Sequence, residues 1–153
     1  MKSGTWLLRL ALLLLFLGLF FGFLASFAYR LTDAKSGMLG FLTLRPLHVS
    51  SAYFGVVLGG LACVTLAIQK ETVKRISFNL LKIHLFLWLI TLVGIFYSYF
   101  TGDFGGREYW EFKPIWALPI LISYFVFLLF YLKNTGSYKN WPVYKWMWFT
   151  GIV

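Results

Sequence analysis

The sequence predicts an all-α integral membrane protein, a helix bundle with four complete transmembrane helices plus the start of a fifth. Hydrophobic residues make up 60% of the 153 residues and charged residues only 12%, whereas soluble domains average about 25% charged residues. The charges also lie at the ends of long uncharged runs. A soluble fold of this size could not bury so much apolar surface, so we expect residues 1–153 to form a single membrane domain.

Four uncharged runs are long enough to cross a bilayer, which requires about 20 residues of helix. Lipid offers no partner for backbone polar groups, so each run must be helical. The alternating pattern of a membrane β-barrel does not occur in the sequence. The runs cover residues 10–29, 46–69, 83–102 and 114–132.

The first run has the features of a membrane anchor and some of those of a cleavable signal peptide. Lys2 and Arg9 give it a positive start. Its apolar stretch is too long for a typical signal peptide, and residues 26–28 (Ser-Phe-Ala) make a poor cleavage site. We therefore expect an uncleaved first anchor.

The later runs have charged or proline boundaries. The second begins at Pro46, and proline suits a first helical turn, where its missing N–H costs nothing. The third lies between Lys82 and Asp103, and the fourth lies between Lys113 and Lys133.

After the fourth run the chain starts another apolar helix. Residues 141–145 (Trp-Pro-Val-Tyr-Lys) have the pattern of a helix start, and residues 146–153 are apolar but too short to span a bilayer. We therefore expect the chain to be the N-terminal fragment of a larger polytopic subunit.

The basic residues indicate the orientation. With a cytoplasmic N-terminus, nine Lys and Arg fall inside and five fall outside, which favours that orientation. This distribution also accounts for the net charge of +9, which in a soluble chain would suggest nucleic acid as a partner. The inside residues are Lys2, Arg9, Lys70, Lys74, Arg75, Lys82, Lys133, Lys139 and Lys145, and the outside residues are Arg30, Lys35, Arg45, Arg107 and Lys113.

His48 is the first candidate for chemistry. It follows Leu-Arg-Pro-Leu at the outer start of the second run. An ionisable residue at a membrane helix end is a functional candidate by default. The alternative is a histidine that forms a hydrogen bond at the level of the lipid headgroups, and the residue by itself favours neither.

A strip of small residues follows His48 at helical spacing. Such strips let another helix approach closely, and Gly55 and Gly59 form a GxxxG pair, so helix packing is the favoured interpretation. A flat cofactor would need the same strip beneath an imidazole, and haem is the flat cofactor that takes a single helix histidine as an axial ligand. The strip consists of Ser51, Ala52, Gly55, Gly59, Ala62 and Cys63.

The outer loop between the third and fourth runs holds a second cluster. Glu108 and Glu111 are three residues apart, so one helical turn would place both on one face, and grouped carboxylates suit calcium. A solvated loop with interfacial aromatic residues is the favoured alternative for a bare pair. Arg45 and Arg107 lie on the same side of the membrane as His48, within reach of the propionates of a haem bound there.

The remaining candidates are weaker. His84 lies at the inner start of the third run, where we expect an interfacial or packing histidine that cannot share a haem with His48. Cys63 is expected to be a small core hydrophobe, and a single Cys excludes a disulfide framework and a multi-Cys metal site. No nucleotide-binding glycine loop, Ser/His/Asp set or zinc motif is present.

The histidine motif and the outer loop together resemble one family. Residues 44–48 (Leu-Arg-Pro-Leu-His) and the small-residue helix after them resemble the second helix of subunit I in the haem–copper oxidase superfamily. The most similar branches are the large subunit of nitric oxide reductases and the catalytic subunit of cbb-three-type cytochrome oxidases. Residues 106–111 (Gly-Arg-Glu-Tyr-Trp-Glu) look like the loop between the third and fourth helices of those branches.

The resemblance implies a site and a role in electron transfer. It makes His48 an axial ligand of low-spin haem b and Glu108 a ligand of a calcium ion bridging the haem propionates, with Glu111 as the second acid of that motif. The whole protein would be a respiratory oxidoreductase that reduces O₂ or NO, and the sequence does not distinguish these substrates. The ligands of its copper or non-haem iron centre would lie in the missing downstream part.

The resemblance also implies partners and a location. The partners are the remaining C-terminal part of the subunit, the membrane, and a cytochrome c-type subunit or quinol as electron donor, with no role for nucleic acid. The location is a bacterial inner membrane, with the N-terminus in the cytoplasm.

A different class of function stays open from the sequence. The chain could be a small non-enzymatic membrane protein, either a helix-packing subunit or a haem-carrying accessory protein. A transporter is disfavoured, because the runs carry no charge at mid-membrane and few helix breaks.

Overall fold

A computed structural model describes residues 3–30, 37, 39–71, 78–107 and 110–153. Over these ranges the chain is all-α, as predicted, and no strand is formed. The helices are α1 (Ser3–Arg30), α2 (Phe41–Glu71), α3 (Phe78–Phe100), α4 (Ala117–Asn134) and α5 (Val143–Ile152), with short 3₁₀ helices η1 (Pro114–Trp116) and η2 (Tyr138–Asn140).

Four helical segments are long and apolar enough to cross a membrane, which confirms the predicted spans. They cover Gly4–Arg30, Phe41–Glu71, Asn79–Phe100 and Pro114–Asn134. Each of the four includes at least one of the charged residues that bound the uncharged runs, because long basic side chains can keep their charged ends in water while their stems stay on the helix. The chain is therefore a multi-pass membrane protein.

The start of the second helix differs from the prediction. Helix α2 begins at Phe41, so Pro46 lies inside the helix and not in its first turn. The N–H groups of Thr43 and Leu44 both donate to the Gly40 carbonyl, which starts the helix ahead of the proline. Pro46 therefore removes one hydrogen bond of the helix ladder, the one to the carbonyl four residues earlier.

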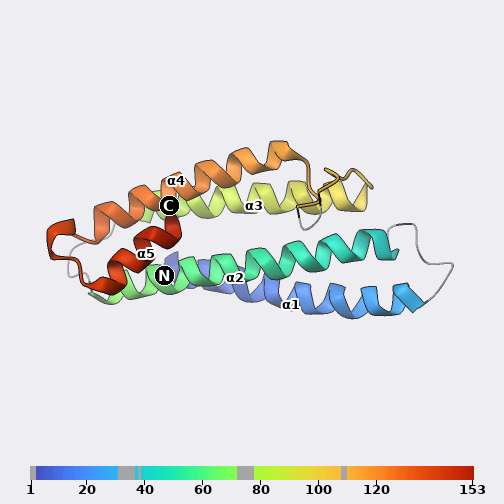
Figure 1. The fold of residues 1–153 in the computed structure, drawn as a ribbon, viewed down its shortest axis with the longest axis horizontal. Helices are drawn as coiled ribbons and strands as arrows, with labels where there is room; N and C mark the ends of the chain where they lie inside the picture. Colours follow the sequence, from blue (N-terminus) through green and yellow to red (C-terminus); the bar gives the residue numbers. More distant parts are fainter. Residues whose placement is uncertain (1–2, 31–36, 38, 72–77, 108–109) are drawn as a thin grey trace.

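The helices form two antiparallel pairs. Helix α1 packs along α2, and α3 packs along α4, so that two layers lie side by side (Figure 1). Helix α3 also contacts α1 and α2, which joins the layers. The interior between them is apolar and aromatic, and its largest buried side chains include Leu7, Leu58, Trp88, Ile95, Phe127 and Phe130.

The outer surface of the bundle is apolar as well. Leu19 of α1, Val93 of α3 and Leu121 of α4 are each about 70% exposed. Contiguous exposed apolar surface of this kind is unsuited to water. Lipid chains cover it in a membrane, so this surface agrees with the hydropathy of the spans.

Different segments of the chain lie at the two ends of the bundle. The end of α1, the start of α2 and residues 101–107 lie at one end, which we call the His48 end (Figure 1). The end of α2, the end of α4 and the start of α5 lie at the other end, which we call the α5 end. His48 and the loop before α4 thus share one end, as predicted from the count of spans.

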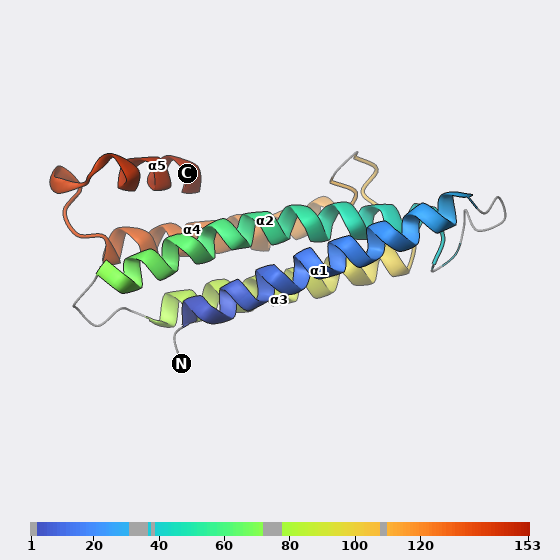
Figure 2. The same cartoon turned by 90° about the horizontal axis from the view of Figure 1, so that it is seen from below.

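Helix α5 begins where the fifth helix was predicted. Its 10 described residues are by themselves too short to span a bilayer, so its assignment as the start of a fifth transmembrane helix stays a prediction. It lies alongside the bundle, on the face formed by α2 and α4 (Figure 2). A pocket of about 660 Å³ is lined by Cys63 and Val64 of α2, Tyr124 of α4, and Trp148 and Ile152 of α5, among others.

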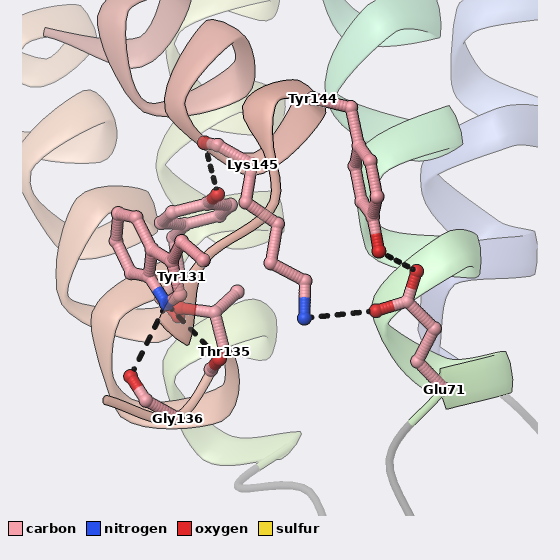
Figure 3. A network of polar contacts seen from close by, with 7 residues as sticks. Glu71, Tyr131, Thr135, Gly136, Tyr144 and Lys145 are labelled. Carbon is pink, nitrogen blue, oxygen red and sulfur yellow. Dashed lines mark hydrogen bonds and ion pairs between the residues drawn. The ribbon is translucent and has the colours of Figure 1, made fainter. Parts of the chain in front are cut away.

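Polar contacts fasten α5 to the ends of α2 and α4 (Figure 3). The Lys145 ammonium lies 3.0 Å from a Glu71 carboxylate oxygen, and the Tyr144 hydroxyl donates to the other oxygen over 3.0 Å. The Tyr131 hydroxyl of α4 donates to the Lys145 carbonyl over 2.6 Å, and the Trp141 indole donates to the Thr135 carbonyl over 3.1 Å.

Candidate functional site

His48 lies in the second turn of α2, half-buried, and its ring is fixed by the neighbouring helix. Its Nδ1 lies 2.7 Å from the carbonyl oxygen of Gly18 in α1. A carbonyl only accepts hydrogen bonds, so Nδ1 carries the proton in a neutral ring, and the lone pair is on Nε2. Nε2 makes no hydrogen bond to any side chain or backbone group that the structure describes. Among the described residues, Nε2 therefore keeps a lone pair that is available to a metal ion.

The small-residue strip below His48 is used for helix packing. A Cβ on Gly55 would lie 2.8 Å from Cγ of Leu15, and a Cβ on Gly18 would lie 3.0 Å from the Ala52 backbone nitrogen. The packing interpretation of the strip is therefore confirmed. At Ala52 and Gly55, α1 already occupies this face of α2, so these two positions leave no space for a flat ring.

Cys63 also differs from its prediction. It was expected in the core, but the side chain is exposed and faces the pocket between α2 and α5. The reason is its place on the helix: the buried positions around it, Leu61, Ala62 and Thr65, turn towards the bundle. Helical spacing alone did not show where the buried face ends.

The charged residues of the His48 end gather around one pocket. It has a volume of about 390 Å³ and is lined by Arg45 of α2 together with Arg107 and Glu111 of the loop. The Arg45 guanidinium lies 3.2 Å from a Glu111 carboxylate oxygen. Three of the residues expected to act together are thus brought together. Glu108, the other predicted acid, lies outside the described residues.

Glycines give the loop the shape that returns Glu111 to α2. Gly102 and Gly106 have φ of +73° and +75°, a conformation that side chains disfavour. The Gly105 N–H donates to the Glu111 carbonyl, and a Cβ at Gly105 would collide with the Phe112 backbone. The loop therefore closes on itself. A second ion pair connects the two ends of the loop, with the Lys113 ammonium 2.6 Å from an Asp103 carboxylate oxygen.

A buried hydroxyl pair that sequence reasoning missed joins α2 to α3. The Ser50 and Tyr99 hydroxyls lie 2.8 Å apart. The Tyr99 ring is stacked on Phe104 of the loop, with centroids 5.8 Å apart and planes at 25°. The available signal was the pair of tyrosines, Tyr97 and Tyr99, near the end of an apolar run, because a tyrosine hydroxyl needs a polar partner when it is buried.

His84 is fully buried between α3 and α4, far from His48 along the bundle. Its Nδ1 lies 2.9 Å from the Ser123 carbonyl oxygen and 2.8 Å from the Ser123 hydroxyl. Its Nε2 is buried and makes no hydrogen bond within the described parts of the chain. The full burial of His84 agrees with the packing role that we expected for it as one of two possibilities.

No group of three or more His, Cys, Asp or Glu side chains that could hold a metal ion occurs among the described residues. The candidate site therefore consists of one histidine with a free nitrogen and a charged pocket at the same end of the bundle. Such a set can supply a single axial ligand and can pair with acidic groups, but it does not enclose an ion.

Comparison with known proteins agrees with these features. The chain is 31% identical over 122 residues to cytochrome c oxidase subunit 1 of Rhodobacter capsulatus. The match covers 74% of this chain and 22% of that protein, so the chain spans about a fifth of its relative's length. No family model matches the chain, and neither does any solved structure. The similarity indicates a relation at the level of the haem–copper oxidases, in a membrane protein with four candidate spans.

Proposed function

We propose that this chain is the N-terminal part of the catalytic subunit of a respiratory haem–copper-type terminal reductase, a cytochrome c oxidase or a nitric oxide reductase. Its contribution is to hold a low-spin haem b through His48. The observation that carries the proposal is the 2.7 Å contact between His48 Nδ1 and the Gly18 carbonyl, which leaves Nε2 as the ligand atom. The similarity to an oxidase subunit supports the same class.

The residues fit haem b as one of its two axial ligands. A metal-binding histidine commonly donates its second ring N–H to a backbone carbonyl, which fixes the tautomer and raises the basicity of the ligand nitrogen. His48 has this arrangement. When bound, haem b supplies a one-electron carrier. The second axial ligand must come from elsewhere, because His84 lies towards the other end of the bundle.

The charged pocket fits the acidic groups of such a cofactor. Arg45 and Arg107 supply two guanidinium groups and Glu111 one carboxylate, so the described lining carries a net charge of about +1. Guanidinium groups bind carboxylates through paired hydrogen bonds. We propose that these two arginines bind the haem propionates.

Calcium requires more than the described residues offer. Glu111 is the one acid in the described lining of the pocket, and it is paired with Arg45. Calcium takes six to eight oxygen ligands, so this lining by itself favours an anion. The proposal of a calcium ion at this end therefore depends on Glu108 joining Glu111.

The remaining parts of the proposed enzyme would be supplied by other segments. We propose that the C-terminal part of the subunit holds the copper or non-haem iron centre. The electron donor would be a cytochrome c-type subunit or quinol. The proposed location is a bacterial inner membrane with the N-terminus in the cytoplasm, which the excess of basic residues at the α5 end supports.

The small-residue strip of α2 gives no support to the alternative of a helix-packing subunit. Packing on another protein through this strip would require that the strip be exposed. Gly55 and Ala52 instead pack on α1 of the same chain, so the strip is not available to an external helix.

The experiment that tests the proposal is His48→Ala in the whole protein in its native membrane. The substitution should abolish the low-spin haem b signal in the reduced-minus-oxidised spectrum, while the protein still inserts into the membrane. His84→Gln is the control, because it keeps a polar side chain in a buried place remote from the charged pocket. An unchanged haem b spectrum in His48→Ala would overturn the proposal.

A further inference from the structure

We propose that Gly22 of α1 is a positioning residue for His48. By lacking a side chain, it admits the imidazole to the Gly18 carbonyl and thereby selects the ring tautomer with a free Nε2. That this tautomer serves to bind haem rests on the proposed function. The gap in the surface of α1 at Gly18 and Gly22, which we call the notch, is argued only from contacts between α1 and α2.

The notch follows from helix geometry. Gly18 and Gly22 are four residues apart, so they lie one above the other on the same face of α1. Within the helix, the carbonyl at position 18 already accepts from the N–H at position 22. The His48 Nδ1 makes a second, lateral approach to that carbonyl at 2.7 Å. This approach passes directly over Gly22.

The imidazole occupies the space that a side chain at position 22 would need. A Cβ on Gly22 would lie 2.6 Å from His48 Nδ1, 2.8 Å from Cε1 and 3.2 Å from Cγ. The three nearest atoms all belong to one ring. Even an alanine methyl group would therefore displace the imidazole from the Gly18 carbonyl.

Gly22 differs in this respect from Gly18 and Gly55, two other close contacts between α1 and α2. A Cβ on Gly18 would meet the backbone of Ala52, and a Cβ on Gly55 would meet the backbone and side chain of Leu15. Those two glycines set the distance between the helices. At Gly22 the obstacle is a movable side chain, so a methyl group there moves the ring and leaves the helix pair assembled.

The position of the ring decides its chemistry. A neutral imidazole has one protonated and one unprotonated nitrogen, and the hydrogen bond of one nitrogen sets the state of the other. The Gly18 carbonyl requires a proton on Nδ1. If the ring is displaced, this requirement is lost, and the proton can move to Nε2, where it blocks coordination.

The test compares the unmodified chain with its Gly22→Ala, Gly59→Ala and His48→Ala variants in lipid bilayers by solid-state NMR of ¹⁵N-labelled histidine. In the unmodified chain, His48, assigned by its loss in His48→Ala, should be neutral and protonated at Nδ1. Gly22→Ala should shift the ratio of the two tautomers towards Nε2–H by about fivefold, the change expected from losing one neutral hydrogen bond. The matched control is Gly59→Ala in the same helix interface, where a Cβ would meet only the Ala11 methyl at an ordinary 3.9 Å.

The outcomes separate this inference from the proposed function. An Nε2–H tautomer in the unmodified chain would overturn it without any variant, as would an Nδ1–H tautomer that persists in Gly22→Ala. A tautomer shift in Gly22→Ala, combined with a haem b spectrum that survives His48→Ala, would support the notch and refute the haem role. In the whole protein, Gly22→Ala should also raise the haem b midpoint potential, because a ligand without the Nδ1 hydrogen bond is a weaker electron donor.

Discussion

The hydroxyl groups of Ser50 and Tyr99 lie 2.8 Å apart in the buried contact between α2 and α3. Ser50 follows His48 by two residues, and Tyr99 stacks on Phe104, which lines the charged pocket. One hydrogen bond thus connects the helix that carries the candidate ligand with the loop that carries Glu111. This connection explains how two segments far apart in the sequence keep a fixed geometry at the His48 end.

Removing the Tyr99 hydroxyl should destabilise the bundle. Tyr99→Phe leaves the buried Ser50 hydroxyl without its partner, which costs about 1–3 kcal/mol of unfolding free energy. Replacing both groups, in Ser50→Ala with Tyr99→Phe, should restore part of that loss, because no unpaired polar group remains. Denaturant unfolding of the four forms in detergent gives the coupling energy, and strictly additive effects would contradict the contact.

The contact of α1 with α2 should be sensitive at Gly55 and insensitive at Gly60. A Cβ on Gly55 would overlap Leu15, whereas nothing lies within 4 Å of a Cβ on Gly60. Overpacking of this kind costs about 1–3 kcal/mol, so Gly55→Ala should lower the melting temperature. Gly60→Ala, in the same helix, should leave it unchanged or raise it. Equal melting temperatures would show that α1 does not occupy the strip.

The ion pair at the α5 end should hold α5 against the bundle. Glu71→Gln removes the charge that binds Lys145 and weakens the bond from Tyr144, both at 3.0 Å. Hydrogen exchange of the α5 amides, followed by mass spectrometry, should become faster by several fold. A charge-assisted bond contributes roughly 1.5–3 kcal/mol at most, and the contribution of this pair is smaller because it is partly exposed. Lys139→Gln, an exposed lysine of η2, is the control. Unchanged exchange in Glu71→Gln would contradict the fastening role.

The orientation in the membrane can be measured at two exposed positions. In a Cys63→Ser background, Thr101→Cys lies at the His48 end and Asn140→Cys lies at the α5 end. A membrane-impermeant thiol reagent added to intact cells should label position 101 and not position 140, since basic residues favour the cytoplasmic side. Labelling at 140 with protection at 101 would reverse the orientation.

Sequence physics alone determined the helical class and the number of spans. Runs free of charge and about 20 residues long have to be helices in lipid, because the backbone polar groups find no other partner. The candidate residues at one end also followed from the count of spans, since His48 and the loop before α4 must emerge on the same side. The pairing of Arg45 with Glu111 agrees with that expectation.

The tertiary structure decided what each local pattern is used for. The strip below His48 consists of residues that suit either a packed helix or a flat cofactor, and only the position of α1 selects packing. The sequence also left His84 open between an interfacial and a packing position, placed Cys63 in the core and started the second helix at Pro46. In the structure His84 is buried, Cys63 is exposed and α2 begins at Phe41. These properties depend on which face of a helix meets its neighbours, and an apolar helix in lipid carries little hydrophobic periodicity to reveal that face, since lipid and protein interior are equally apolar. The contact of His48 with Gly18 and Gly22 also could not be predicted from the sequence. It joins residues about 30 positions apart that only the packing of α1 on α2 brings together.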